Sequence, residues 1–221
     1  MTAGGPRVSA IVCVRNGARW IARALASIRA QRRPPDDIVV VDGRSTDGTA
    51  AIAAAPDVRI VIQPGTGLAD ARNAGIAAAA GDLLAFLDHD DRWTPDKLAI
   101  QLDLMDATGA DHCVGHLRRV RIDGAPVAGP LGAPRLGRTP GTLLATRGAF
   151  DRIGGFDPAL GMGCDMDWFI RAGDCGPPAA IASEIVLLKS IRADSLSADP
   201  AANRRAALAV LAGRRRRQAS R

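Results

Sequence analysis

The chain has 221 residues, a length that fits one α/β domain and allows a substantial buried core. No apolar run approaches the roughly 20 residues of a membrane-spanning helix, and the start lacks the charged-then-apolar pattern of a secretion signal. The formal net charge of +6 is concentrated at one end, because residues 203–221 hold seven Arg and no acid. Without these seven charges the body has a net charge of about −1, which argues against nucleic-acid binding by the body. The lack of a spanning run and of a secretion signal predicts a cytoplasmic protein.

The Arg-rich end, residues 201–221, is expected to form a basic tail. Such a tail is either a solvated helix or a peripheral contact with anionic lipid at a membrane surface. The cysteines have no paired C-x-x-C spacing, so free thiols are expected rather than a zinc site or disulfides. They are Cys13, Cys113, Cys164 and Cys175.

Strand and helix patterns alternate four times along the first 107 residues. Short β-branched or apolar runs predict strands at 8–14, 37–41, 58–62 and 83–87. Apolar residues at helical spacing and polar helix starts predict helices at 18–30, 45–55, 68–80 and 94–107. Alternation of this kind predicts a parallel sheet with right-handed crossovers.

The second half of the chain is less regular. A hairpin is predicted over 111–127 with its turn at Asp123-Gly124, followed by a loop over 129–140 that is rich in Gly, Pro and Arg. Further elements are a short strand at 143–146, a helix at 165–172 and a strand at 181–189. No linker is long enough to separate two domains.

Polar side chains follow three of the predicted parallel strands. Asn16, Asp42 and the turn Asp88–Asp91 come directly after apolar runs, so they are expected to meet at one edge of the sheet, where such folds bind ligands. The three carboxylates of the last turn repel one another, and a divalent cation held by oxygen ligands would offset that repulsion and attract phosphate. The alternative is a solvated turn that caps the helix beginning near Thr94-Pro95.

Six segments, in order between residues 8 and 197, resemble the family 2 nucleotide-sugar glycosyltransferases, which have the GT-A fold. They are VSAIVCVRNG (8–17), VVDGRSTDGT (40–49), ARNAGI (71–76), FLDHDD (86–91), GGFD (154–157) and CDMDWFIR (164–171). The resemblance implies an α/β three-layer sandwich with a mixed, mostly parallel sheet. It implies one domain over 1–200, with a nucleotide-binding half at about 7–107 and an acceptor and catalytic half at about 108–200.

The resemblance also implies the chemistry. The protein is expected to move a sugar from a nucleoside-diphosphate sugar, with UDP as the expected nucleotide, to an acceptor hydroxyl with inversion. Asp42 corresponds to the acid that receives the nucleobase, and Asp88 to the acid near the ribose and donor sugar. The nucleotide-sugar site is expected to comprise Val14, Asn16, Asp42, Arg72, Asp88 and Arg192.

Two further acids carry the reaction in this interpretation. Asp90 matches the family's ligand for Mg²⁺ or Mn²⁺, a cation that would stabilise the departing diphosphate. Asp165 matches the general base, which removes the proton of the attacking hydroxyl. Without the resemblance, Asp165 could be a helix cap, Arg72 a surface residue, and Asp42 or Asp47 a cap of the helix at Ser45.

The sequence departs from the family pattern after Asp42 and beside Asp165. Gly43 and Arg44 replace the second acid and the Gly that follow Asp42. Cys164 replaces a Glu beside the base, and because a thiol is normally neutral near pH 7, Asp167 becomes a possible substitute base.

A third departure lies near the end of the match. Arg192 stands where many members have a His, and it could pair with phosphate but cannot bind a metal. Asp194 could replace the missing ligand.

Two other functions remain open. One is a nucleotide-sugar-binding protein that has lost catalysis, and the other is a nucleotidyltransferase on a related sheet, which would need a Gly-rich basic loop after the first strand. The acceptor is unknown, although residues 129–140 and the region after Gly161 are expected to line its site. The limited sequence beyond the catalytic region argues against a processive polymerase.

Overall fold

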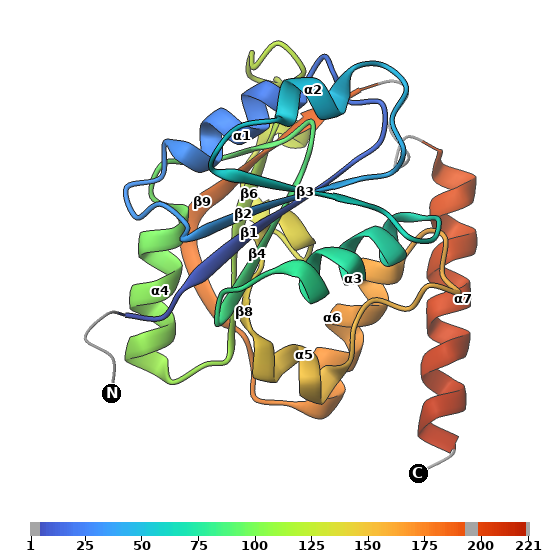
Figure 1. Cartoon of the computed structure of the whole chain (residues 1–221). Coiled ribbons are helices and arrows are strands. Elements are labelled where there is room, and N and C mark those ends of the chain that lie inside the picture. The colour runs from blue at the N-terminus through green and yellow to red at the C-terminus, as the bar shows by residue number, and fades with distance from the viewer. Residues whose placement is uncertain (1–4, 193–198, 220–221) are drawn as a thin grey trace.

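A single twisted sheet runs through the body of the protein (Figure 1). The computed structural model describes residues 5–192 and 199–219. The strands are β1 (Val8–Val14), β2 (Asp37–Asp42), β3 (Val58–Ile62), β4 (Leu83–Asp88), β5 (Arg92–Trp93), β6 (His112–Arg121), β7 (Arg135–Leu136), β8 (Leu144–Thr146) and β9 (Ala180–Ile191). The sheet order is β3-β2-β1-β4-β8-β6-β9-β5, and β7 pairs with β6.

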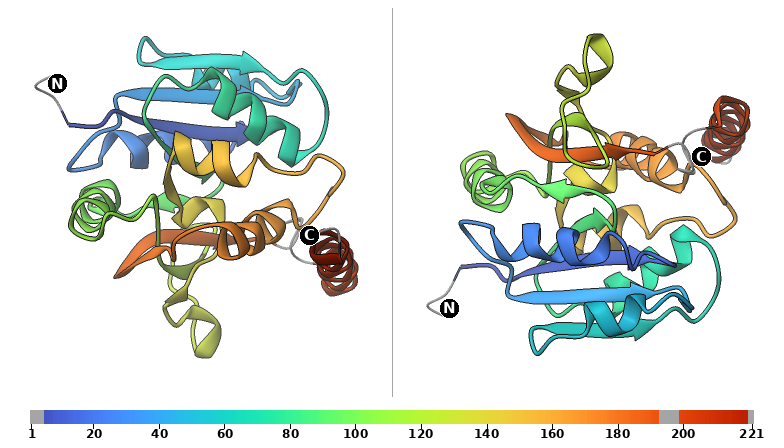
Figure 2. Two further views of the ribbon diagram at one scale, coloured as in Figure 1. Left: turned by 90° about the horizontal axis from the view of Figure 1, so that it is seen from below. Right: turned by 90° about the horizontal axis from the view of Figure 1, so that it is seen from above.

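Helices cover both faces of this sheet. They are α1 (Ile21–Arg29), α2 (Thr49–Ala53), α3 (Leu68–Ala78), α4 (Lys97–Thr108), α5 (Arg147–Ile153), α6 (Cys164–Cys175) and α7 (Pro200–Ala219), with 3₁₀ turns η1 (Pro130–Gly132) and η2 (Pro140–Thr142). One buried cluster packs residues of α1, α2 and α4 on one face, and the other packs α3, α5 and α6 on the opposite face. The expected three-layer arrangement is therefore present (Figure 2).

The first four main strands are parallel, as their apolar runs and the helices between them predict. β1 lies between β2 and β4, with Val14 opposite Asp42 and Cys13 opposite Asp88. This register brings the three predicted strand ends to one edge of the sheet.

The second half of the chain extends the same sheet. β8 is antiparallel to both β4 and β6, and β9 is parallel to β6. Two reversals restore the original direction, so β9 runs the same way as β4 and its carboxyl end reaches the same edge. Residues 189–192 therefore lie beside the acidic turn at 88–91, although about a hundred residues separate them in sequence.

The structure corrects several boundaries. The helix predicted at 45–55 is shortened to α2, because Ser45 and Thr46 hydrogen-bond to Asp42 and Asn16 instead of continuing a helix. The hairpin predicted over 111–127 is reduced to one bridge, Val120 with Pro126, and β6 instead pairs with β7 from the predicted loop. The short elements β5, α5, η1 and η2 were not predicted.

The basic end is a docked helix rather than a solvated tail. In α7, Val210 is only 1% exposed, and α7 packs against α6 on the side of the molecule toward which β1 and β2 point (Figures 1 and 2). Ion pairs also join Arg214 to Asp174 and Arg217 to Asp167. Within the described residues, no helix has both the length and the apolar character needed to cross a bilayer.

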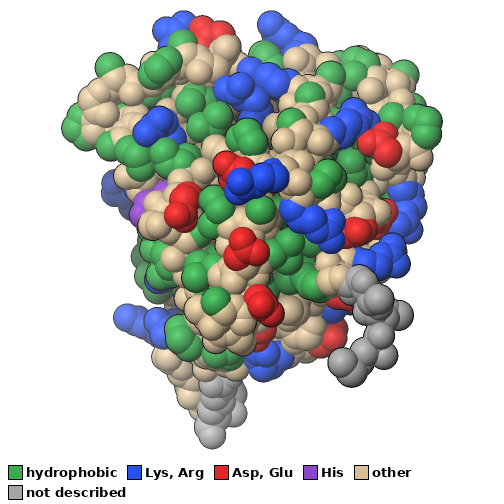
Figure 3. All heavy atoms as spheres, turned by 90° about the vertical axis from the view of Figure 1, so that its left-hand side faces the viewer, with side chains coloured by type: hydrophobic (Ala, Val, Ile, Leu, Met, Phe, Trp, Pro, Cys, Tyr) green, Lys and Arg blue, Asp and Glu red, His purple; other side chains and the backbone are tan. Residues whose placement is uncertain are grey.

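The face opposite α7 carries acidic and basic side chains interspersed with apolar ones (Figure 3). No single sign of charge dominates it, which agrees with the placement of the chain's basic excess at its C-terminal end. The four cysteines are free thiols, as expected.

Candidate active site

The turn after β2 is tied to the turn after β1 by a polar network. Asp42, only 3% exposed, accepts hydrogen bonds from the Ser45 hydroxyl at 2.5 Å and the Ser45 amide at 3.1 Å. The Ser45 hydroxyl in turn accepts the Asn16 amide at 2.8 Å, and the Asn16 side-chain oxygen accepts the Thr46 amide at 2.9 Å. Asp42 and Asn16 are thus brought together, as predicted.

Val14 takes part in the same region through its backbone. Its side chain is buried, and its carbonyl oxygen accepts the Gly43 amide at 2.8 Å. A Cβ at Gly43 would lie 3.1 Å from both the Arg15 Cβ and the Gln63 Oε1, so the turn is tight at this point.

Arg44, which replaces a Gly of the family pattern, adopts a left-handed backbone with φ of +59°. This region favours glycine, so the Arg backbone is strained there. Its guanidinium donates to the Pro64 carbonyl oxygen at 3.1 Å, which directs the side chain toward the segment after β3.

Arg72 is buried and is not a surface residue of α3. It is 3% exposed and lies 5.3 Å from the centre of the Phe156 ring. Its guanidinium contacts Asp88 Oδ1 at 3.3 Å and Cys164 Sγ at 3.5 Å. Burial lowers the pKa of Arg72, but Asp88 together with Cys164, Asp165 and Cys13 more than offsets this, and the net pKa is raised. Arg72 therefore links the end of β4 to the start of α6.

Each acid of the turn after β4 is paired with a cation. Asp91, 1% exposed, contacts Lys189 Nζ at 3.2 Å and accepts the Ser190 amide at 2.7 Å. Lys189 also lies 3.6 Å from Asp88, and Arg192 Nε lies 2.9 Å from Asp90 Oδ2. The solvated-turn alternative does not describe this arrangement.

Burial and these ion pairs act in opposite directions on the pKa values. Burial raises the pKa of Asp88, but Lys189 and Arg72 more than offset it, so the pKa of Asp88 is lowered. Burial raises the pKa of Asp91, and Asp88 and Asp90 add to that effect while Lys189 opposes it. Burial would lower the pKa of Lys189, yet Asp91 and Asp88 raise it overall, so this side chain stays cationic.

Sequence reasoning missed Lys189 and Ser190. Ser190 donates its hydroxyl to the Asp90 carbonyl oxygen at 2.6 Å, so both residues of β9 hold the acidic turn. The sequence does place a Lys at the end of an otherwise apolar strand. Because a lysine ammonium is rarely buried without a partner, this Lys predicts a nearby acid. The partner could not be identified without the pairing of β9.

The two candidate bases differ in their surroundings. Asp165, partly exposed at the start of α6, accepts the amide of the following residue, Met166, at 2.9 Å. Asp167, 1% exposed, contacts Arg171 at 2.7 Å and Arg217 of α7 at 2.8 Å. Asp165 is therefore the more accessible carboxylate.

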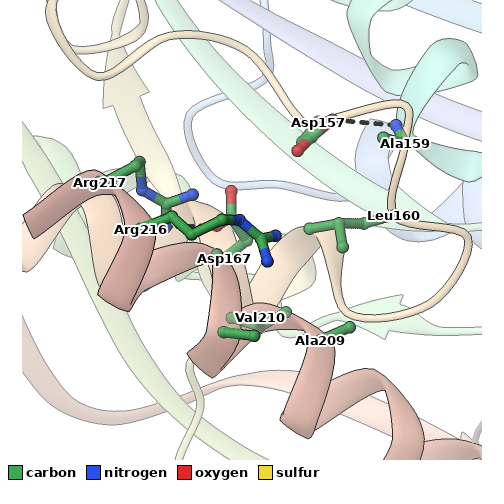
Figure 4. A pocket seen from close by; sticks show the side chains of 10 residues that line it. Asp157, Ala159, Leu160, Asp167, Ala209, Val210, Arg216 and Arg217 are labelled. Carbon is green, nitrogen blue, oxygen red and sulfur yellow. Dashed lines mark hydrogen bonds and ion pairs between the residues drawn. The ribbon is translucent and has the colours of Figure 1, made fainter. Parts of the chain in front are cut away.

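Two cavities flank α6. One, of about 470 Å³, is lined by Asp165, Met166, Phe169, Ile170, Gly173 and Asp174 of α6 together with Arg138 and Arg214. The other, of about 460 Å³, lies between α6, α7 and the segment at 157–160, and Arg216 and Arg217 reach into it from α7 toward Asp167 (Figure 4). The first cavity includes part of the predicted acceptor region, since Arg138 comes from the 129–140 segment.

The residues present fit a metal ion only in part. Within residues 5–192 and 199–219, no three His, Cys, Asp or Glu side chains are grouped to hold a cation. Asp90 offers one carboxylate, already paired with Arg192. Mg²⁺ is commonly held by one or two carboxylates together with substrate phosphates and water, so Asp90 fits a cation shared with a diphosphate. Asp194, the suggested substitute ligand, lies outside the described residues.

The sequence profile of glycosyl transferase family 2 matches residues 9–158. The chain belongs to this family. The match covers five of the six quoted segments, namely all those that precede α6, and places the turns after β1, β2 and β4 inside the family region.

Relatives extend the similarity in sequence. The chain is 42% identical over 123 residues to the succinoglycan biosynthesis protein ExoO of Rhizobium meliloti, a match that covers 54% of this chain and 35% of that protein. An uncharacterized glycosyltransferase of Mycobacterium tuberculosis is 31% identical over 198 residues, covering 80% of this chain and 72% of its own. The chain spans less than half the length of several relatives it matches.

Solved structures share the fold. TarS from S. aureus, in complex with UDP, aligns with a TM-score of 0.71 at 20% identity, covering 85% of this chain and 61% of its own. The mannosyltransferase PcManGT from Pyrobaculum calidifontis, solved with GDP-Man and Mn²⁺, aligns with a TM-score of 0.65 at 25% identity, covering 87% of this chain and 59% of its own. The expected GT-A fold is confirmed.

Proposed function

We propose that this protein is an inverting glycosyltransferase that moves a sugar from a nucleoside-diphosphate sugar, with UDP as the expected nucleotide, to an acceptor hydroxyl. The observation that carries the proposal is the bridge formed by Arg72 between Asp88 and Cys164, the residue before Asp165. It joins the proposed donor acid to the helix that carries the proposed base. The GDP-Man complex of the similar mannosyltransferase supports a nucleotide-sugar donor.

We assign the residues at this edge of the sheet to three parts of the donor, namely the nucleobase, the ribose and the diphosphate. Asp42 and Asn16 shape the turns after β2 and β1 and would face the nucleobase. Asp88, held by Arg72 and Lys189, would lie near the ribose and the donor sugar. Arg192 and Lys189 would contribute positive charge near the diphosphate.

A dication bound at Asp90 would act as a Lewis acid toward the leaving diphosphate. Asp90 would supply one ligand oxygen, and the other ligands would come from phosphate and water. The Mn²⁺ found in the mannosyltransferase complex supports Mg²⁺ or Mn²⁺ as the cation.

Asp165 is the proposed general base. It is partly exposed and lines the 470 Å³ cavity, so an acceptor hydroxyl bound there could transfer its proton to this carboxylate. Asp167 is not proposed as the base, because two guanidinium groups occupy its oxygens. Its proposed role is to hold α6 against α7.

The neutral thiol beside the base favours one alternative, a binding protein without turnover. Burial raises the pKa of Cys164, and although Arg72 opposes this, the pKa stays above its ordinary value, so the family's extra negative charge is missing. A nucleotidyltransferase is disfavoured, because the loop after β1 already uses its amides: Gly17 donates to Thr49 and Ala18 to Asp47.

The proposal is tested by thermal shift with a panel of nucleotides, with and without Mn²⁺. UDP should raise the melting temperature in a metal-dependent way, and Asp90→Ala should remove the metal dependence. Stabilisation by GDP alone would overturn the nucleobase assignment at Asp42. Release of UDP from UDP-sugars by the wild type but not by Asp90→Ala would exclude the binding protein, whereas consumption of nucleoside triphosphate with pyrophosphate release would favour a nucleotidyltransferase.

A further inference from the structure

The end of β9 supplies a cation to each carboxylate of the acidic turn. Arg192 pairs with Asp90 at 2.9 Å, and Lys189 contacts Asp91 at 3.2 Å and Asp88 at 3.6 Å. The proposed metal-ligand carboxylate therefore already has a resident positive charge. A divalent cation that approaches Asp90 must compete with Arg192, since the two would share one carboxylate.

The Arg192–Asp90 contact can be exchanged more readily than the contacts of Lys189. Asp90 is 12% and Arg192 19% exposed, and their 2.9 Å contact lacks the alignment of a hydrogen bond. Lys189 contacts two carboxylates, of which Asp91 is 1% exposed. Removing the charge partner of so deeply buried an acid is costly, so Lys189 is expected to stay in place.

The backbone before Arg192 is anchored independently of its side chain. The Ser190 amide donates to Asp91 and its hydroxyl donates to the Asp90 carbonyl oxygen. Arg23 also donates to that carbonyl oxygen, at 3.3 Å. The guanidinium of Arg192 can therefore turn to a new partner while the strand end remains beside the acidic turn.

A diphosphate is a strong competitor for this guanidinium. Arg presents a planar fork of donors that matches phosphate oxygens, and the resulting charge-assisted hydrogen bonds are stronger than neutral ones. Movement of Arg192 from Asp90 to the diphosphate would leave a carboxylate oxygen for the cation. Both ligands would then gain by arriving together.

We propose that Arg192 is the competing counter-ion of Asp90, and that it couples the binding of a divalent cation to that of the nucleoside diphosphate. The bare protein then binds the cation weakly, and the nucleotide increases cation affinity by drawing Arg192 away. Thermodynamic linkage requires that the cation increase nucleotide affinity by the same factor. This inference rests on the proposed nucleotide-sugar site.

The test is Mn²⁺ binding followed by electron paramagnetic resonance, with and without UDP, in wild type, Arg192→Gln and Arg192→Lys. UDP should raise the Mn²⁺ affinity of the wild type by about tenfold or more, which corresponds to roughly 1.4 kcal/mol of coupling. Arg192→Gln should bind Mn²⁺ several-fold more tightly without UDP and should show at most a third of the coupling factor. Arg192→Lys retains the competing charge, so its Mn²⁺ affinity without UDP should stay near that of the wild type.

A second readout is UDP binding in the presence of EDTA, measured by calorimetry. Arg192→Gln should bind UDP several-fold more weakly than the wild type there, because it lacks the phosphate partner. Arg215→Gln, which changes an exposed arginine of α7, is the matched control and should behave as the wild type in both assays.

The outcomes separate the two proposals. If UDP binds with Mn²⁺ dependence but Arg192→Gln shows the wild-type Mn²⁺ affinity and coupling, the role of Arg192 is refuted and the nucleotide site stands. If the wild type binds no UDP with or without Mn²⁺, the proposed function fails as well. Equal melting temperatures of the variants without ligand would show that a change in binding does not arise from unfolding.

Discussion

Lys97, the first residue of α4, is a fully buried lysine. Its ammonium contacts the Gln101 side-chain oxygen, lies 3.3 Å from the Leu143 carbonyl oxygen, and lies 5.0 Å from the centre of the Trp93 ring. Burial lowers its pKa to about 7, with Cys113 opposing the shift. Between that value and the ordinary lysine pKa, the unfolded state binds one more proton than the folded state, so stability rises with pH in this window.

We therefore predict that the free energy of unfolding of the wild type rises by about 1.5 kcal/mol more than that of Lys97→Met between pH 7 and 8.5. Urea denaturation at several pH values measures this difference. Restricting the comparison to this window limits the opposing effect of buried cysteines, whose raised pKa values reduce stability at higher pH. Parallel pH profiles of the two proteins would contradict the assignment.

The two acids of α6 give a second prediction at this scale. Asp165→Asn should lower kcat by about 10²- to 10⁴-fold, because it removes the proposed proton acceptor, while UDP affinity stays unchanged. Initial rates of transfer or donor hydrolysis and calorimetric UDP binding separate these effects.

Asp167→Asn is the matched comparison. It should lower the free energy of unfolding by about 1–3 kcal/mol. This loss is smaller than that usual for a fully buried ion pair, because Arg217 is 39% exposed and solvent screens its charge. A larger loss of kcat per folded molecule in Asp167→Asn than in Asp165→Asn would exchange the two roles.

Residues that follow single strands could be predicted from the sequence. Asn16, Asp42 and Asp88 each end an apolar run, and parallel strands bring such ends together. Lys189 could not be predicted in the same way, because its contact with Asp91 depends on the parallel pairing of β6 and β9, which no local pattern encodes.

At the scale of elements, α7 is a structural support for α6. Val210 and Ala206 of α7 pack on Gly163, where a Cβ would lie 3.2 Å from a Val210 methyl group. Gly163 has a φ of +88° and is the N-cap residue of α6, two positions before Asp165. Docking of α7 therefore holds the start of the helix that carries the proposed base.

We predict that Val210→Ala lowers the free energy of unfolding by about 1–2.5 kcal/mol, because it removes buried methyl groups from this contact. Leu208→Ala, at a position 63% exposed on the same helix, should cost less than about 0.5 kcal/mol. Urea denaturation measures both, and limited proteolysis should release α7 earlier in Val210→Ala. Equal stability of the two variants would mean that α7 is not held through Val210.

The sequence indicated the long elements but not the short ones that depend on tertiary contacts. α3 and β4 follow their apolar patterns, whereas β5 has two residues and exists because Arg92 and Trp93 pair with β9. The helix expected at 45–55 lost its first turn to hydrogen bonds with Asp42 and Asn16. In each case a partner distant in sequence overrides the local preference.

At the scale of the whole molecule, the outward face of α7 offers a surface of mixed character. Arg204 and Arg205 are exposed beside Leu208 and Leu211, which are 63% and 47% exposed. Their helical spacing places a basic and apolar stripe on one side of α7. We propose that this stripe makes a peripheral contact with anionic lipid.

We expect the protein to sediment with anionic lipid vesicles and to be released by salt, and not to sediment with neutral vesicles. The double variant Arg204→Gln with Arg205→Gln should bind roughly 25-fold more weakly, at about 1 kcal/mol for each arginine. Binding that is equal on neutral vesicles, or insensitive to this variant, would contradict the contact.

The position of β9 beside the acidic turn has a consequence for folding during synthesis of the chain. The acidic turn at 88–91 leaves the ribosome about a hundred residues before Lys189 and Arg192, the side chains that neutralise it. At translation rates of roughly 5–20 residues per second that interval is on the order of 5–20 seconds, during which Asp90 and Asp91 lack their cation partners and only Asp88 can pair, with Arg72. Completion of this half therefore waits for the last strand, and a ribosome stalled before β9 should display a protease-sensitive amino-terminal half.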